Sequence, residues 1–181
     1  MIINKLILLY FILSGGILLG RSPIRNAAEK YIISQFDVDV SISMHTLKLD
    51  AELKALVQNK VKQRFYRNEL YYWTISNGDT TIAYSLMDNV IGKSMPITFL
   101  VILNNEGSIL ASEVIKYREA YGSEVGNKNW LAQFTYFNDT TDFKVGKNID
   151  GISGATISVN SLSKGIQKMA ILFPFIKDKL N

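Results

Sequence analysis

The chain of 181 residues contains no cysteine and a single histidine, His45. Without cysteine there is no disulfide, no thiolate-held zinc or iron–sulfur centre, no covalent c-type haem and no cysteine nucleophile. One histidine excludes a metal site built from several histidines of this chain, and we interpret His45 as structural or exposed. Redox chemistry in this protein therefore requires a cofactor that depends on neither residue type.

Charge of neither sign dominates, because 20 Lys and Arg stand against 16 Asp and Glu, a net charge of +4. The densest basic group comprises Lys60, Lys62, Arg64 and Arg67 on a predicted helix that also carries acidic residues. Such mixed charge is typical of a solvated helix face, so we expect no nucleic-acid partner. No cluster of ligand-type side chains predicts a metal site, and no constellation predicts catalytic residues.

An uncharged apolar run is confined to the start of the chain, from Leu6 to Gly20. At about 1.5 Å per residue this run is shorter than a bilayer core of about 30 Å. Counted from Ile2, with the Lys5 side chain reaching back to the headgroups, it is long enough. Residues 1–20 are therefore a membrane anchor or a signal segment. Because no A-x-A cleavage site is present, we favour an uncleaved single-pass anchor.

Residues 21–181 read as one domain with helices on either side of a block of hairpins. Ser22 and Asp50 are predicted to cap two helices, the second with apolar residues every four positions as far as Phe65. Asn77-Gly78 is predicted to form a two-residue hairpin turn between strands. The strands are expected at 38–48, 70–76, 80–86, 97–103 and 108–117, with the last two joined by Asn104–Gly107.

The C-terminal part is predicted to be helical again. A short helix is expected over Asn127–Phe134, and a long one starts near Thr156 or Ser158 and is ended or kinked by Pro174. The fold class is therefore α+β: a mostly antiparallel sheet of hairpins with flanking helices, preceded by the N-terminal membrane helix.

The segment from Asp150 to Ser158 reads D-G-I-S-G-A-T-I-S. Its small residues, Gly151, Ser153, Gly154 and Ala155, predict a tight turn that another molecule can approach closely. Thr156 stands at the predicted helix start, where free backbone N–H groups and the helix dipole favour an anion such as phosphate. Ser153, Thr156 and Ser158 add hydroxyl donors. The residues alone leave two interpretations open, a phosphate-accepting loop and an ordinary capped helix with a glycine-rich entry.

D-G-I-S-G-A-T resembles the flavinylation motif, D-x-x-[ST]-G-A-T, of the FMN-binding domain family. That family includes the G subunit of Rnf-type complexes and the C subunit of sodium-pumping NADH:quinone oxidoreductases. The resemblance implies that Thr156 carries FMN through a phosphoester bond and that residues 21–181 are an FMN-binding domain. Asp150, Ser153, Gly154 and Ala155 match the other motif positions, and Ser158 follows within the same helix start.

A second stretch is similar to a loop that family members place upstream of the motif, of the type E-T-P-G-L-G. Glu119 and Gly122 stand where its glutamate and glycine fall, whereas Ala120-Tyr121 replaces the Thr-Pro pair. The resemblance implies that the flavin ring lies against this loop. Tyr121 is the candidate stacking residue and Trp130 a second one, and ordinary packing is the alternative for both.

The resemblance further implies a separate flavin transferase as partner, with FAD as donor and Mg²⁺ as helper. We expect an electron-transfer flavoprotein, anchored in the cytoplasmic membrane with its C-terminal domain on the extracytoplasmic side, that serves a membrane electron-transfer complex or other redox carriers. Two alternatives stay open: an FMN-dependent terminal reductase of a small extracytoplasmic acceptor, and a membrane-tethered binding module without flavin.

Overall fold

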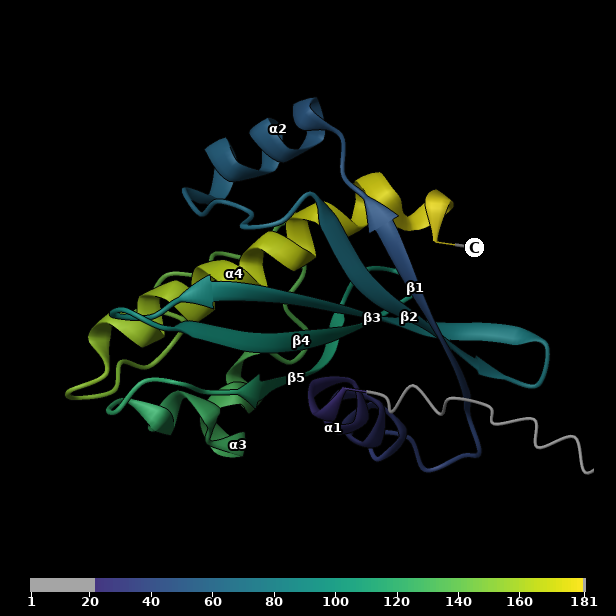
Figure 1. Cartoon of the computed structure of the whole chain (residues 1–181), viewed down its shortest axis with the longest axis horizontal. Coiled ribbons are helices and arrows are strands. Elements are labelled where there is room, and N and C mark those ends of the chain that lie inside the picture. The colour runs from purple at the N-terminus through teal and green to yellow at the C-terminus, as the bar shows by residue number, and fades with distance from the viewer. Residues whose placement is uncertain (1–21, 181) are drawn as a thin grey trace, which may run out of the picture.

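A computed structural model describes residues 22–180, and its centre is one five-stranded sheet. The strands lie in chain order and each pairs antiparallel with the next (Figure 1). They are β1 (Ser41–Lys48), β2 (Glu69–Asn77), β3 (Thr80–Ile91), β4 (Pro96–Asn104) and β5 (Ile109–Lys116). The predicted antiparallel α+β fold is therefore confirmed for the described part of the chain.

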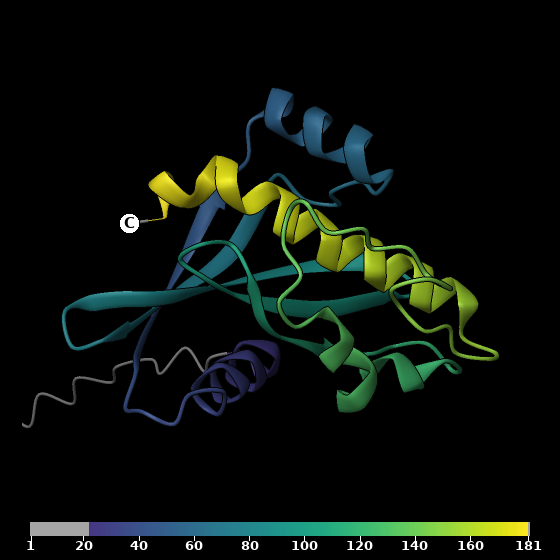
Figure 2. The same ribbon diagram turned by 180° about the vertical axis from the view of Figure 1, so that it is seen from behind.

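Helices cover both faces of the sheet (Figures 1 and 2). The long α4 (Thr156–Ile176) lies along one face with α2 (Ala51–Val61) beside it, and α1 (Pro23–Ile33) lies on the opposite face. The short α3 (Lys128–Leu131) packs near β5. The larger apolar core fills the space under α4, and a smaller one, which includes Ala28, Ile32 and Trp73, lies under α1.

The predicted membrane helix falls on residues 1–20, which lie outside the described residues. Between residues 22 and 180, no helix combines the length and the apolarity that crossing a bilayer requires.

Both predicted helix caps are present. The Ser22 hydroxyl accepts from the Arg25 N–H at 3.2 Å, and the Asp50 carboxylate accepts from the Leu53 N–H at 2.7 Å. The second helix is shorter than predicted, because Lys62 adopts the left-handed conformation with φ of 57° and ends it. Phe65 therefore lies in the following loop, where it is still buried.

The predicted hairpins form, with one shift in register. Asn77 pairs with Thr80, so the two-residue turn is Gly78-Asp79 and not Asn77-Gly78. Gly78 supplies the positive φ, 57°, that this turn needs. In the β4–β5 turn, the Asn104 side chain accepts from the N–H groups of Glu106 and Ser108, as is typical of asparagine in turns.

Helix α4 begins at Thr156, one of the two predicted starts, and runs two residues beyond Pro174. Proline removes only the hydrogen bond that its own N–H would give, and so close to a helix end little further bonding is lost. Pro174 therefore does not end the helix, which continues to Ile176.

Lys168 is a buried cation at the middle of α4. Its Nζ atom lies 2.7 Å from the carboxylate of Asp88 on β3 and donates to the carbonyl oxygen of Arg64 at 2.9 Å. The same atom lies 4.4 Å from the centre of the Phe65 ring. Burial lowers the pKa of Lys168, and the carboxylate of Asp88 opposes that change. This single side chain joins α4, the sheet and the loop after α2.

Gly165 is where α4 comes closest to the sheet. A Cβ atom there would lie 2.6 Å from Val90 Cγ1 and 2.9 Å from Phe99 Cζ, and both neighbours are buried. Alanine gains about 1 kcal/mol in helix propensity over glycine, but overpacking a core costs about 1–3 kcal/mol. We expect Gly165→Ala to lower the free energy of unfolding in urea, whereas Lys164→Ala on the exposed side of α4 leaves it nearly unchanged. Equal stability of the two variants would contradict the close contact.

Candidate functional site

The loop that enters α4 is a tight turn centred on Gly154. The Ala155 N–H donates to the Ile152 carbonyl at 3.1 Å, and Gly154 has φ of 79°. A positive φ at this position is the mark of a type II turn, which favours glycine. A Cβ atom at Gly154 would meet nothing within 4 Å, so glycine serves the backbone conformation and leaves open space above the turn.

The first turn of α4 has no side-chain cap. Ala155 occupies the cap position and cannot accept a hydrogen bond from the helix N–H groups. The unsatisfied N–H groups and the positive end of the helix dipole therefore face the loop. The Thr156 side chain is exposed here, whereas Ala155 and Ser158 are buried beneath it. This arrangement presents one hydroxyl at an anion-binding helix end.

An open cleft of about 580 Å³ lies in front of this helix end. Its walls come from three separate segments: Lys93 and Ser94 of the β3–β4 turn, Glu119 to Tyr121 after β5, and Gly154 to Ser158. The structure thus brings together the two stretches singled out in the sequence. Asp150, Ser153 and Gly122 do not line the cleft, and Lys93 and Ser94 were not predicted.

Glu119 holds the β3–β4 turn. Its Oε1 atom accepts from the N–H groups of Ser94 at 2.6 Å and Met95 at 2.8 Å, and its Oε2 atom accepts from the Ser94 hydroxyl at 3.2 Å. These bonds, first the one from Met95 and then the one from Ser94, hold the pKa of Glu119 below its ordinary value. A Cβ atom at Gly92 would lie 2.7 Å from Oε1, so a side chain there would displace the carboxylate. The Glu119 carboxylate is therefore engaged in shaping the cleft wall.

We expect the hydrogen bonds between Glu119 and the β3–β4 turn to weaken as the pH falls. The folded-state pKa of Glu119 lies below its unfolded value, so its stabilising effect is complete above the unfolded pKa and is lost as the pH falls through the folded pKa. Glu119→Gln should remove this dependence, and amide hydrogen exchange of Ser94 and Met95 measures it. Exchange at these two amides that stays equally slow in the Gln variant would contradict the role of the carboxylate.

Tyr117 links the loop after β5 to the first turn of α4, and it was not predicted as a site residue. Its hydroxyl donates to the Tyr121 carbonyl and lies 3.1 Å from the Ser158 hydroxyl. Gly122 is packed against the same group, since a Cβ atom there would lie 2.9 Å from Tyr117 Oη and 3.3 Å from Ala155 Cβ. The sequence signal was an aromatic residue at the end of the last predicted strand, directly before the loop.

Trp130 holds the start of the Asp150–Ser158 motif in place. Its indole N–H donates to the Asp150 carbonyl at 2.8 Å, and the Asp150 N–H donates to Gln133 Oε1, also at 2.8 Å. Trp130 is buried against Phe134 and does not line the cleft in front of α4. Tyr121, 85% exposed, is the aromatic side chain at the cleft that remains available for stacking.

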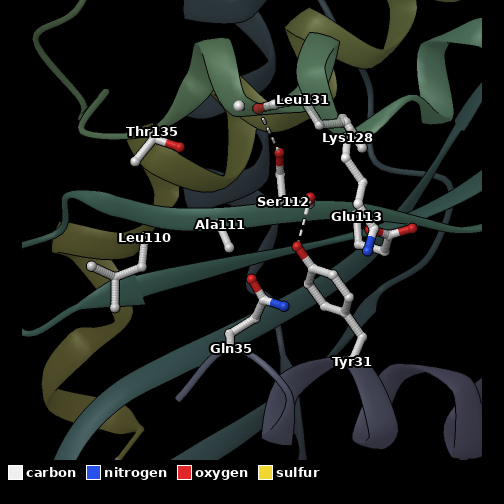
Figure 3. A pocket seen from close by; sticks show the side chains of 10 residues that line it. Tyr31, Gln35, Leu110, Ala111, Ser112, Glu113, Lys128, Leu131 and Thr135 are labelled. Atoms are coloured by element: carbon white, nitrogen blue, oxygen red, sulfur yellow. Dashed lines mark hydrogen bonds between the residues drawn. The ribbon is translucent and has the colours of Figure 1, made fainter. Parts of the chain in front are cut away.

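A smaller cavity of about 210 Å³ lies between α1, β5 and α3 (Figure 3). The Tyr31 hydroxyl donates to the Ser112 carbonyl at 3.0 Å, and burial raises the pKa values of Tyr31 and Glu113. No residue of the Asp150–Ser158 motif lines this cavity. His45 is exposed on β1 and stacks on Tyr72, as expected for a structural histidine. Over residues 22–180, no group of three ligand-type side chains could hold a metal ion.

Comparison with known proteins bears on the family resemblance of the motif. Residues 92–170 match the family model described as FMN-binding domain. This part of the chain is similar to an FMN-binding domain. The match includes the cleft walls and the Asp150–Ser158 motif, so the predicted family resemblance is confirmed and FMN is supported as the ligand.

The fold of this chain is similar to that in the crystal structure of Shewanella oneidensis NqrC. The TM-score is 0.56 at 15% sequence identity, and the similarity covers 83% of this chain and 87% of that chain. At this identity the similarity concerns the fold. Among curated proteins, none matches this chain significantly.

Proposed function

We propose that this protein is a membrane-anchored, extracytoplasmic flavoprotein that relays electrons through FMN held covalently by Thr156. The observation that carries the proposal is the exposed Thr156 side chain at the uncapped start of α4, beside an open cleft within an FMN-binding domain. Electron transfer follows from the cofactor, because FMN supplies one- and two-electron chemistry when bound.

The residues present fit the cofactor. The N–H groups at the start of α4 suit its phosphate, since no side chain caps them. The Lys93 ammonium lines the same cleft and adds a positive charge. Tyr121 is exposed at the rim and offers an aromatic face to a flat ring. Glu119 and Tyr117 fix the loop that carries Tyr121 through the hydrogen bonds described above.

Attachment requires help from another protein. A threonine hydroxyl is a poor nucleophile without a base, and no histidine or carboxylate is hydrogen-bonded to Thr156 among residues 22–180. In the proposed step, Thr156 Oγ forms a bond to the FMN phosphorus of FAD, the pyrophosphate bond breaks and AMP leaves. The hydroxyl proton passes to a base of the flavin transferase, whose Mg²⁺ assists the departure. The exposed loop leaves room for that enzyme.

Anchorage and location complete the proposal. Residues 1–20 would hold the domain at the cytoplasmic membrane as a single-pass anchor, and residues 21–181 would form the extracytoplasmic domain. Outside the cytoplasm a dissociated cofactor is lost, so a covalent bond is useful there. The partners would be subunits of a membrane electron-transfer complex or other redox carriers.

Peptide mapping tests the proposal. The full chain is produced with a flavin transferase, denatured and digested with trypsin, which releases the peptide 148–164. We expect this peptide to gain the mass of FMN less one water, with fragment ions placing the addition on Thr156. A peptide without added mass in the native host, under conditions where other flavoproteins are loaded, would contradict covalent attachment.

A further inference from the structure

Three arginine side chains surround a separate cleft on the α1 side of the sheet, which we name the arginine cleft. Arg25 comes from α1, Arg67 from the loop before β2, and Arg118 from the segment after β5. The cleft has a volume of about 310 Å³ and shares no lining residue with the proposed flavin cleft. Segments far apart in the sequence thus place three permanent positive charges around one hollow.

Most donors of these guanidinium groups have no acceptor among the residues that the structure describes. Arg118 donates from Nη1 to the Pro96 carbonyl at 2.9 Å and the Thr98 hydroxyl at 3.0 Å, which fixes its position, and its other nitrogens have no hydrogen bond to residues 22–180. Arg25 uses Nε for Glu29 at 2.7 Å. Arg67 lies over the Tyr71 ring at 5.9 Å and pairs with no carboxylate among the described residues. Each guanidinium carries five N–H donors, so the cleft holds donors that lack an acceptor.

The acidic groups near the cleft do not neutralise it. Asp88 is paired with Lys168 at 2.7 Å, on the side toward α4. Glu29 is paired with Arg25. Glu69 is exposed at the rim and lies opposite Lys48 in the β1–β2 register. An anion entering the cleft therefore meets unopposed charge from Arg67 and Arg118.

The floor of the arginine cleft is apolar. Ile24, Met44, Tyr71 and Met87 line it beside the charged groups. Ser22, the first described residue, lies at its edge, so the cleft stands where the chain continues into residues 1–20. A ligand that suits this site has an anionic group for the arginines and an apolar part for the floor, and lipid phosphates lie at the end of a membrane anchor.

We propose that the arginine cleft binds a phosphate ester, and that its source is the headgroup of a membrane phospholipid. Arginine forks bind phosphate through paired hydrogen bonds, which gives the site its chemistry. The choice of a lipid over a free phosphate rests on the proposed anchorage, whereas phosphate binding itself does not. A bound headgroup would hold the α1 face toward the membrane and fix the orientation of the flavin cleft relative to it.

The test uses the full chain purified in dodecyl maltoside. Native mass spectrometry counts retained phospholipid, and calorimetric titration with glycerol 3-phosphate and with inorganic phosphate gives dissociation constants. The variant is Arg67→Gln, and the matched control is Arg64→Gln, an exposed arginine of the same loop that stacks on Tyr66 and does not line the cleft. Both residues are exposed, so both variants are expected to fold.

We expect the wild type and Arg64→Gln to retain phospholipid and Arg67→Gln to bind about tenfold more weakly, the loss of one charge-assisted contact. Binding of the two soluble phosphates without retained lipid would keep the site and make a free phosphate its ligand. No binding of any phosphate, or equal losses in both variants, would overturn the proposal. Thr156→Ala should bind phosphate normally, so failure of the flavin proposal is recognised separately.

Discussion

Thr156→Ala is expected to remove all covalently held flavin from the protein. The change deletes the hydroxyl that we propose forms the phosphoester, and it leaves the backbone of the turn and of α4 in place. Because Thr156 is exposed and its side chain caps nothing, the variant should fold as the wild type does. In-gel flavin fluorescence after denaturation, with the transferase co-produced, measures the effect.

Two matched variants make this result specific. Thr156→Ser keeps a hydroxyl at the same position and should retain flavin, in a smaller amount. Ser153→Ala removes the hydroxyl of another motif position, one that does not line the cleft, so flavin that this variant still carries is not attached through Ser153. Fluorescence that persists in Thr156→Ala and is lost in Ser153→Ala would place the bond on the other residue.

Lys168→Met is expected to lower the free energy of unfolding by about 3–5 kcal/mol, the range found when one partner of a buried ion pair is removed. Methionine fills a similar volume, but it leaves the Asp88 carboxylate buried without its counter-charge and the Arg64 carbonyl without its donor. Urea unfolding followed by tryptophan fluorescence gives the value. Lys164→Met, at an exposed position of α4, should change it by less than about 0.5 kcal/mol.

Removing both charges should restore much of the loss. In Lys168→Met/Asp88→Leu no carboxylate is left unpaired, and apolar pairs of this kind are often neutral or stabilising relative to the ion pair. The double variant should therefore be more stable than Lys168→Met alone. If the two changes simply added, the ion pair would carry no coupling and the buried contact would be contradicted.

The parts of the fold that the sequence predicted are those set by local interactions. Ser22, Asp50 and Asn104 act on backbone groups within four residues, so their caps and turn were visible in the sequence. The extension of β3 to Ile91 was not, because the polar residues Asp88 and Asn89 interrupt the apolar pattern of the strand. Asp88 pairs with Lys168 and Asn89 accepts from Thr98, and these partners lie far away in the chain or on the next strand.

For the site, too, the parts set by one local segment could be predicted, and the parts that depend on distant contacts could not. The turn at Gly154 and the helix start at Thr156 were predictable, because one segment contains both. Lys93 and Ser94 reach the cleft only through the pairing of β3 with β4 and the hydrogen bonds of Glu119. Tyr117 acts through its hydroxyl on Ser158, a contact between residues 41 positions apart. Such convergence depends on strand order, which turn and helix signals alone do not specify.

The clamp on Asp150 by Trp130 and Gln133 has a consequence for the order of events in the cell. Because these protein groups hold its main chain from both sides, the loop that we propose as flavin acceptor takes its shape from the protein's own contacts. We expect a folded apoprotein that can wait for its flavin. The amount of working protein would then follow the supply of flavin, and cells could raise it without synthesising a new chain.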